Sequence, residues 1–192
     1  GQWLRFAARG HIDKTRGALA MWIQPAVDGV GESGRRYFLF HEEGAGLRSN
    51  AMALFLDGDW EMRFHPYANS DYLHIPQARE WRKDEWRHLI VNWDAEQGVC
   101  FAYLDGEPAS WAMGPCLSWS YAQTPWQPQD HEAFFIGAQA SRGANPWLGA
   151  IDEARIFDRP LSPAEARAEF ERFCRRGVFI DALDRYPYAG QA

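Results

Sequence analysis

Apolar and polar residues alternate with a period of two along most of this chain, which is the pattern of half-buried β-strands. The alternation is clearest in residues 86–105. The positions expected to face the core there are Leu89, Val91 and Trp93, followed after a turn by Val99, Phe101 and Tyr103. Asp105 and Gly106 then supply the next turn, because glycine accepts the positive φ that such turns need. This stretch therefore predicts two paired antiparallel strands.

Similar alternation recurs in short segments separated by glycine, proline and aspartate. The further strands predicted from it are residues 3–7, 19–24, 36–41, 51–56, 61–65, 69–75, 134–138 and 148–157. Strands of this length and spacing, with turn formers between them, are typical of an antiparallel meander. The pattern predicts an all-β fold.

One helix is predicted near the end of the chain. Ser162 can cap it, Pro163 suits the first helical position, and Glu165 completes an S-x-x-E capping box. Arginines follow where cations favour a helix C-terminus, and Gly177 is the expected stop. We expect a helix from residue 163 to about residue 176.

Residues 111–130 lack sustained periodicity and read as a long irregular loop. This segment concentrates four large aromatic side chains, Trp111, Trp119, Tyr121 and Trp126. Long ordered loops in compact domains are uncommon and often functional.

The chain has 192 residues, which suits one domain, residues 1–177, with a C-terminal tail at 178–192. The formal net charge of -6 argues against nucleic-acid binding, which relies on clustered Lys and Arg. No apolar run is long enough to insert into a membrane. The first residue is Gly1, so an excised piece of a larger protein is expected.

Three cysteines do not form a disulfide scaffold or a C-x-x-C metal site. A bridge between Cys100 and Cys116 and a set of buried or free thiols both remain open.

Three segments resemble laminin-G-like domains of the concanavalin A-like jelly-roll group. They are the strand ending in Trp-x-x-Pro within residues 12–25, the hairpin 86–106, and residues 135–162 with their Gly-Ala-Ile-Asp-Glu-Ala-Arg-Ile-Phe strand and Leu-Ser turn. The resemblance implies an antiparallel β-sandwich of jelly-roll topology with one short C-terminal α-helix. It also implies a secreted, periplasmic or cell-surface setting. In such a sandwich we expect the inter-sheet core to be filled by Trp22, Trp93, Phe101 and Tyr103.

The same resemblance implies a structural Ca²⁺ ion, since relatives often carry one at the sandwich edge. Asp152 matches the position suited to it, and Asp13 could join it if the first and last strands are adjacent. The alternative is that Asp152 caps turn amides while Glu153 pairs with an arginine.

Candidate catalytic groups are few. The acidic cluster 57–61 and the run His41-Glu42-Glu43 both sit at strand ends, where solvated turns are common. A polysaccharide lyase would need a proton-transferring set. The residues that could supply one are His88, Asn92, Arg155 and Tyr103. We expect His88 and Asn92 to lie instead on the exposed face of their strand.

Carbohydrate recognition fits the surplus of aromatic residues, because flat rings stack on sugars while planar polar groups bind hydroxyls. The predicted contacts are Trp111, Trp119, Tyr121 and Trp126, with Trp60, Trp81 and Trp147 as lesser candidates. The leading hypothesis is a non-catalytic carbohydrate-binding module of a larger protein. A structural or adhesive domain that contacts protein, including neighbouring domains, is the alternative. A polysaccharide-active enzyme using His88, Arg155 and Tyr103 is the third.

Overall fold

The structure, a computed structural model, describes most of the strands and the C-terminal helix. The described residues are 2–13, 15–28, 35–42, 52–59, 61–66, 73–113, 133–139 and 144–174, with the side chains of residues 110–113 left out.

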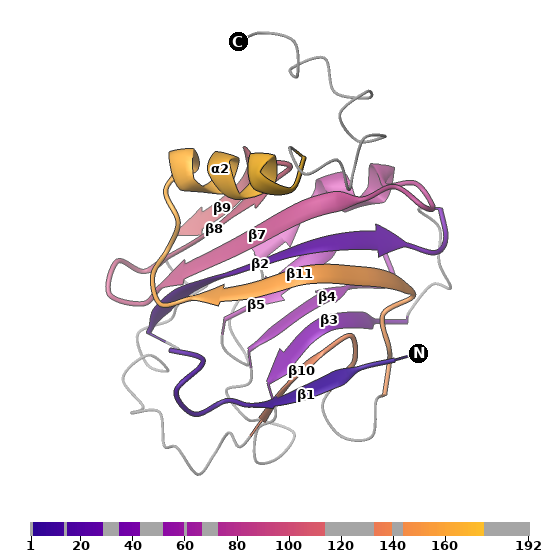
Figure 1. Ribbon diagram of the computed structural model, residues 1–192, viewed down its shortest axis with the longest axis horizontal. Helices are drawn as coiled ribbons and strands as arrows, with labels where there is room; N and C mark the ends of the chain where they lie inside the picture. Colours follow the sequence, from indigo (N-terminus) through magenta and orange to yellow (C-terminus); the bar gives the residue numbers. More distant parts are fainter. Residues whose placement is uncertain are drawn as a thin grey trace, which may run out of the picture.

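Two antiparallel sheets face each other (Figure 1). The six-stranded sheet has the order β1 (Leu4–Ala7), β10 (Ala133–Ile136), β3 (Tyr37–Glu42), β4 (Ala53–Leu56), β5 (Met62–His65) and β6 (Leu73–Ile75). The five-stranded sheet has the order β11 (Gly149–Phe157), β2 (Arg16–Pro25), β7 (Arg87–Asp94), β8 (Val99–Leu104) and β9 (Glu107–Met113). A short 3-10 helix, η1 (Pro76–Glu80), follows β6, and α2 (Pro163–Cys174) closes the described chain. The predicted jelly-roll β-sandwich with one C-terminal helix is confirmed.

The main core fills the space between the sheets. Strand β7 contributes Leu89, Val91 and Trp93, as predicted. The indole Nε1 of Trp93 donates a hydrogen bond to the carbonyl of Asp13 at 2.9 Å, so this buried polar atom is satisfied. Strand β2 contributes Leu19, Met21 and Ile23 to the same core.

In strand β8, the residues that face this core are not the ones that were predicted. Trp93 pairs with Cys100 and Val91 with Ala102, and residues opposite each other in a ladder share a face. Cys100 and Ala102 therefore point inward, while Phe101 and Tyr103 point outward. The prediction was wrong because both faces of this sheet are covered, so apolar residues occupy both alternating sets.

Strand β9 lies where an irregular loop was predicted to begin. Asp105 and Gly106 have φ values of 53° and 82°, which identifies the two-residue turn that joins β8 to β9. Pro108 lies in β9, and proline is tolerated there because β9 is the edge strand of its sheet.

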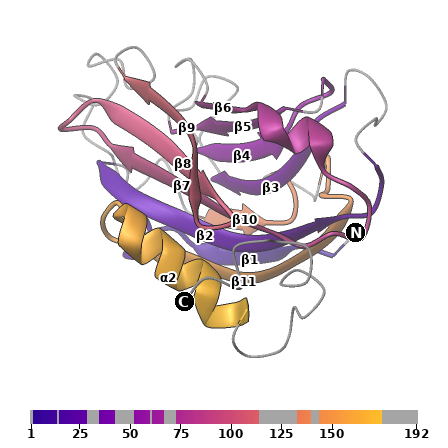
Figure 2. The same ribbon diagram turned by 90° about the horizontal axis from the view of Figure 1, so that it is seen from above.

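Helix α2 covers the outer face of the five-stranded sheet (Figures 1 and 2). Its predicted capping box is present: Ser162 N donates to Glu165 Oε2 at 2.9 Å, and Glu165 N donates to Ser162 Oγ at 3.3 Å. Phe173 and Cys174 pack with Trp22 of β2. Trp22 therefore belongs to the layer between sheet and helix rather than to the inter-sheet core.

Candidate functional site

The outer face of the five-stranded sheet holds the residues considered for a lyase, and it is packed under α2. His88 is only 2% exposed, and its ring lies 5.0 Å from that of Trp22 and 6.1 Å from that of Phe170. Burial, and secondarily the charge of Arg155, lowers the pKa of His88 to about 3. The expectation of an exposed histidine was wrong, because the helix covers the face that sequence alternation assigned to solvent.

The other members of that set also make packing contacts. Asn92 Oδ1 accepts a hydrogen bond from Leu161 N at 2.7 Å, which fixes the chain before α2. Tyr103 is buried in a small cluster near the start of the helix. The Arg155 guanidinium lies 4.9 Å from the centre of the Phe173 ring and pairs with Glu169 at 3.3 Å. These residues join the helix to the sheet.

The outer face of the six-stranded sheet carries a different set of side chains. Strand register places two rows on it, Phe38–Phe55–Arg63–His74 and Arg5–Phe135–His41–Ala53–His65. The phenyl rings in both rows are buried, whereas the polar side chains at the β5–β6 end are partly exposed. We refer to the surface formed by these two rows as the outer row face.

Cations and imidazoles are concentrated on this face. The Arg36 guanidinium lies 5.1 Å from the centre of the Phe55 ring and is about half exposed. Burial lowers the pKa of His41 to about 4. Burial, followed by the charges of Arg36 and Arg63, lowers the pKa of His65 to about 3. Both imidazoles are therefore neutral at pH 7, so each carries one donor and one acceptor nitrogen.

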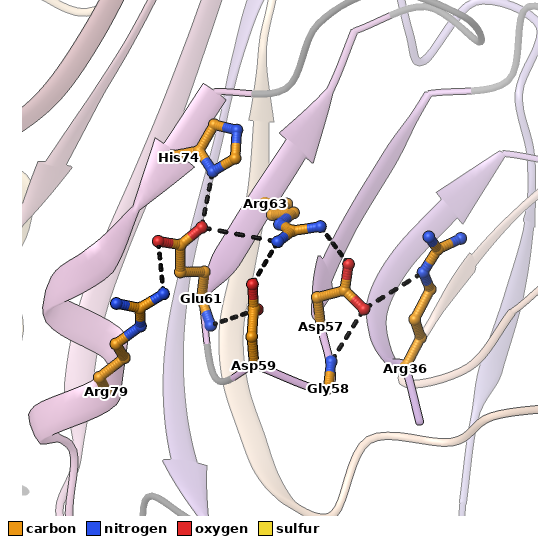
Figure 3. A network of polar contacts seen from close by, with 8 residues as sticks. All are labelled: Arg36, Asp57, Gly58, Asp59, Glu61, Arg63, His74 and Arg79. Atoms are coloured by element: carbon orange, nitrogen blue, oxygen red, sulfur yellow. Dashed lines mark hydrogen bonds and ion pairs between the residues drawn. The ribbon is translucent and has the colours of Figure 1, made fainter. Parts of the chain in front are cut away.

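A network of ion pairs borders this face (Figure 3). Its members, called here the arginine–carboxylate network, are Arg36, Asp57, Asp59, Glu61, Arg63, His74 and Arg79. Arg63 is central and bonds to Asp57 and Asp59. Glu61 accepts from Arg79 at 2.8 Å and contacts His74 Nδ1 at 2.6 Å.

The network balances its own charge, since three arginines face three carboxylates. The partly buried side chains of Asp57 and Glu61 lie inside it, while Arg36, Asp59, His74 and Arg79 are each about half exposed. Donors and acceptors therefore alternate along an accessible border. The sequence signal for this site is the acidic cluster 57–61, placed at a turn by the sequence analysis, followed by Arg63 on the predicted strand 61–65.

The run His41-Glu42-Glu43 cannot act as one acid–base set. His41 belongs to the outer row face, whereas Glu42 points between the sheets, is fully buried, and accepts from Met52 N at 3.2 Å. Glu43 lies outside the described residues. The expectation that this run forms a solvated turn was wrong for Glu42.

The two predicted calcium ligands lie in different places. Asp152 is opposite Trp22, and Asp13 precedes the start of β2 at Arg16, six strand positions away. At about 3.3 Å per residue the separation is on the order of 20 Å. Asp13 Oδ1 accepts from Thr15, and Asp152 Oδ1 caps the amide of Glu153, so both carboxylates serve local turns. Within the described ranges, no group of three or more His, Cys, Asp or Glu side chains could hold a metal ion.

The predicted aromatic contacts are only partly placed. Trp119, Tyr121 and Trp126 lie outside the described residues, and Trp111 belongs to β9 without a described side chain. Trp60 also lies outside. Trp81 and Trp147, considered as lesser contacts, are buried in the main core and are packing residues.

The cysteines offer no described reactive thiol. Burial, followed by the charge of Asp105, raises the pKa of Cys174 to about 11, so its thiol stays protonated at neutral pH. Cys100 is buried in the main core, and Cys116 lies outside the described residues, so the predicted bridge is left as a hypothesis.

The sequence matches the family described as the concanavalin A-like lectin/glucanases superfamily over residues 1–167. The chain belongs to this superfamily. Comparison with curated protein sequences finds no match.

Solved structures similar to this superfamily member include a Ruminococcus gnavus IT-sialidase CBM40 bound to α2,3 sialyllactose. The TM-score is 0.60 at 15% identity, covering 81% of this chain and 83% of the other. A heptameric SAP-like pentraxin from Limulus polyphemus has a TM-score of 0.57 at 13% identity, covering 86% and 73% of the two chains.

A Trypanosoma rangeli sialidase in complex with 2,3-difluorosialic acid has a TM-score of 0.56 at 17% identity, covering 82% of this chain but only 23% of the sialidase. This chain therefore spans about a quarter of the enzyme's length. At such identities the likeness establishes the fold. Among the described helices, none has the length and apolarity needed to cross a bilayer.

Proposed function

We propose that this chain is a non-catalytic carbohydrate-binding module, and that the arginine–carboxylate network at the border of the outer row face contacts the sugar. We further propose that it works outside the cytoplasm as part of a larger protein. The location on this face is favoured because α2 occupies the opposite outer face. Similar folds have been solved with bound sialyllactose, which supports a glycan as the ligand class.

One observation carries the proposal: half-exposed donors and acceptors alternate at the border of an aromatic-rich sheet face (Figure 3). A sugar hydroxyl both donates and accepts hydrogen bonds, so it can bridge a guanidinium and a carboxylate. Arg36 and Arg79 supply planar donors, and Asp59 supplies acceptor oxygens. Because the network is neutral as a whole, the ligand need not carry a charge.

The test is retention of the isolated chain on an array of neutral and sialylated glycans. We expect Arg36→Ala and Arg79→Ala each to weaken retention about tenfold, in keeping with the loss of a charge-assisted hydrogen bond. The matched control is Arg159→Ala, an equally exposed arginine that pairs with Glu165 beside α2. Absence of retention on every glycan, or equal effects of all three substitutions, would contradict the proposal.

The predicted contacts in residues 111–130 can be tested in the same assay. Trp119→Ala and Trp126→Ala should weaken retention if those rings stack on the sugar. For calcium, which also stays a prediction, a chelator should lower the melting temperature, because an ion bound only to the folded state stabilises it.

A further inference from the structure

The sandwich is open along one side. On the far side β6 and β9 contact each other, and Gln77 Nε2 of η1 donates to the carbonyl of Ala109 at 3.0 Å. On the near side, the end strands β1 and β11 leave two adjoining hollows of about 710 and 800 Å³. Both hollows are lined by Phe6, Ile136 and Ala154, so they form one continuous groove, called here the seam groove.

The floor of the seam groove is apolar. Ile136, Ile151 and Ile156 pack against the main core and also line the groove. Five large apolar side chains are exposed among the described residues, and three of them are at β1: Trp3 at 41%, Leu4 at 59% and Phe6 at 42%. Exposed apolar groups concentrated beside a groove mark an interaction site more often than scattered ones do.

Within the part of the chain that the structure describes, strand β1 is also a sheet edge. It pairs with β10 on one side, and the described sheet ends there on the other. Natural proteins commonly cover such an edge or blunt it with charge, proline or a bulge, because an unpaired edge accepts another strand. The four residues of β1 are all exposed and include one charge, Arg5, which belongs to the outer row face.

The charged residues along the rim of the groove favour a positively charged occupant. Four carboxylates line it, Asp13, Asp152, Glu153 and Asp158, and neither Lys nor Arg does. Glu153 is paired with Arg155 at 3.3 Å, which leaves three acids around an apolar floor. A second copy of this chain, with its formal charge of -6, is electrostatically disfavoured there.

We infer that the seam groove binds an extended polypeptide with apolar residues flanked by Lys or Arg, which adds as a strand to the edge of β1 at which the described sheet ends. Main-chain hydrogen bonds to the edge supply affinity in this mode, and alternate side chains supply specificity. Successive side chains of a strand point to opposite faces, so only every second side chain enters the groove. Apolar side chains in the middle of this set lie on the apolar floor, and Lys or Arg at its two ends reach Asp13 and Asp158 in one hollow and Asp152 in the other. This site is separate from the sugar-binding face and does not depend on it.

The probe is a synthetic ten-residue peptide whose alternate positions carry lysine, three valines and lysine, with serine between them. It is titrated into the whole chain at low salt by fluorescence anisotropy, and the control is the same peptide with glutamate in place of lysine. We expect saturable binding of the lysine peptide and slower amide exchange across β1. The double change Asp152→Lys with Asp158→Lys should weaken binding about tenfold, because rim charges govern association and its salt dependence. Glu80→Lys, an exposed charge reversal on η1 at the closed side, should leave it unchanged.

Leu4→Lys provides a second variant that removes apolar contact at a 59% exposed position and is expected to weaken binding without unfolding the domain. The inference is overturned if both peptides bind equally or neither binds. If amide hydrogen exchange across β1 is unchanged when the peptide is bound, the inference is also overturned. Self-association of the chain that Leu4→Lys abolishes would replace the peptide with a second copy and overturn it too.

Discussion

At the scale of single residues, the contact between Gly17 and Trp93 shows how tightly the main core is packed. A Cβ atom on Gly17 would lie 2.4 Å from a ring carbon of Trp93, and Trp93 is held in place by its bond to the Asp13 carbonyl. We predict that Gly17→Ala lowers the free energy of unfolding by about 2 kcal/mol, in the range of overpacked cores. Urea denaturation measures it.

Gly98 is the matched control for that substitution. Its φ is 66° and nothing lies within 4 Å of a Cβ placed there, so Gly98→Ala carries conformational strain alone, about 1 kcal/mol. If the two variants lose the same stability, steric contact with Trp93 is not what makes Gly17 necessary.

The inward-facing residues Leu89, Val91 and Trp93 were predictable because the polar neighbours His88 and Asn92 make their alternation visible. The orientation of Phe101 and Tyr103 was not predictable, since apolar residues on both faces of β8 remove the contrast that periodicity depends on. The arginine–carboxylate network was also missed as a unit, because its members meet only after β4, β5 and β6 pair.

At the scale of elements, the capping box of α2 was predictable because it is local: Ser162 and Glu165 are three residues apart. We predict that Ser162→Ala costs about 1 kcal/mol of stability through the lost cap. Glu165→Gln should cost less, since glutamine can keep the reciprocal bond. Thermal unfolding followed by circular dichroism compares the two, and a larger loss in Glu165→Gln would contradict this account.

Strand β9 was missed although its turn was recognised. Asp105-Gly106 predicts a tight hairpin, and a tight hairpin requires a strand on its far side. The residues from 111 onward show no sustained periodicity, so the sequence pattern does not mark this strand. The edge position of β9 explains how Pro108 is accommodated, but strand order is a tertiary property that local sequence does not contain.

At the scale of the whole molecule, three histidines couple the fold to pH: His88, which is buried, and His41 and His65, which are partly buried. The pKa values of His41, His65 and His88 are lowered to about 4, 3 and 3. Below pH 6.5 the unfolded chain takes up protons that the folded chain refuses, so stability falls as pH falls. The effect at pH 5 is about 2 kcal/mol for each histidine.

Asp105 opposes this trend because burial raises its pKa to about 6, so the folded state takes up that proton first. One carboxyl does not offset three imidazoles. We therefore predict that urea midpoints decrease from pH 7 to pH 5, and that His65→Gln makes the decrease shallower. A midpoint that is constant over this interval would show that the imidazoles gain partners or solvent on protonation.

Every residue of β7 from His88 to Asp94 is buried, with the main core on one side and the helix layer on the other. A charge introduced at any of these seven consecutive positions would lose its hydration. Folding therefore tolerates fewer substitutions along β7 than along β1, whose four residues are all exposed. The strand by which the fold is most readily identified from the sequence is therefore also the one that tolerates the fewest substitutions.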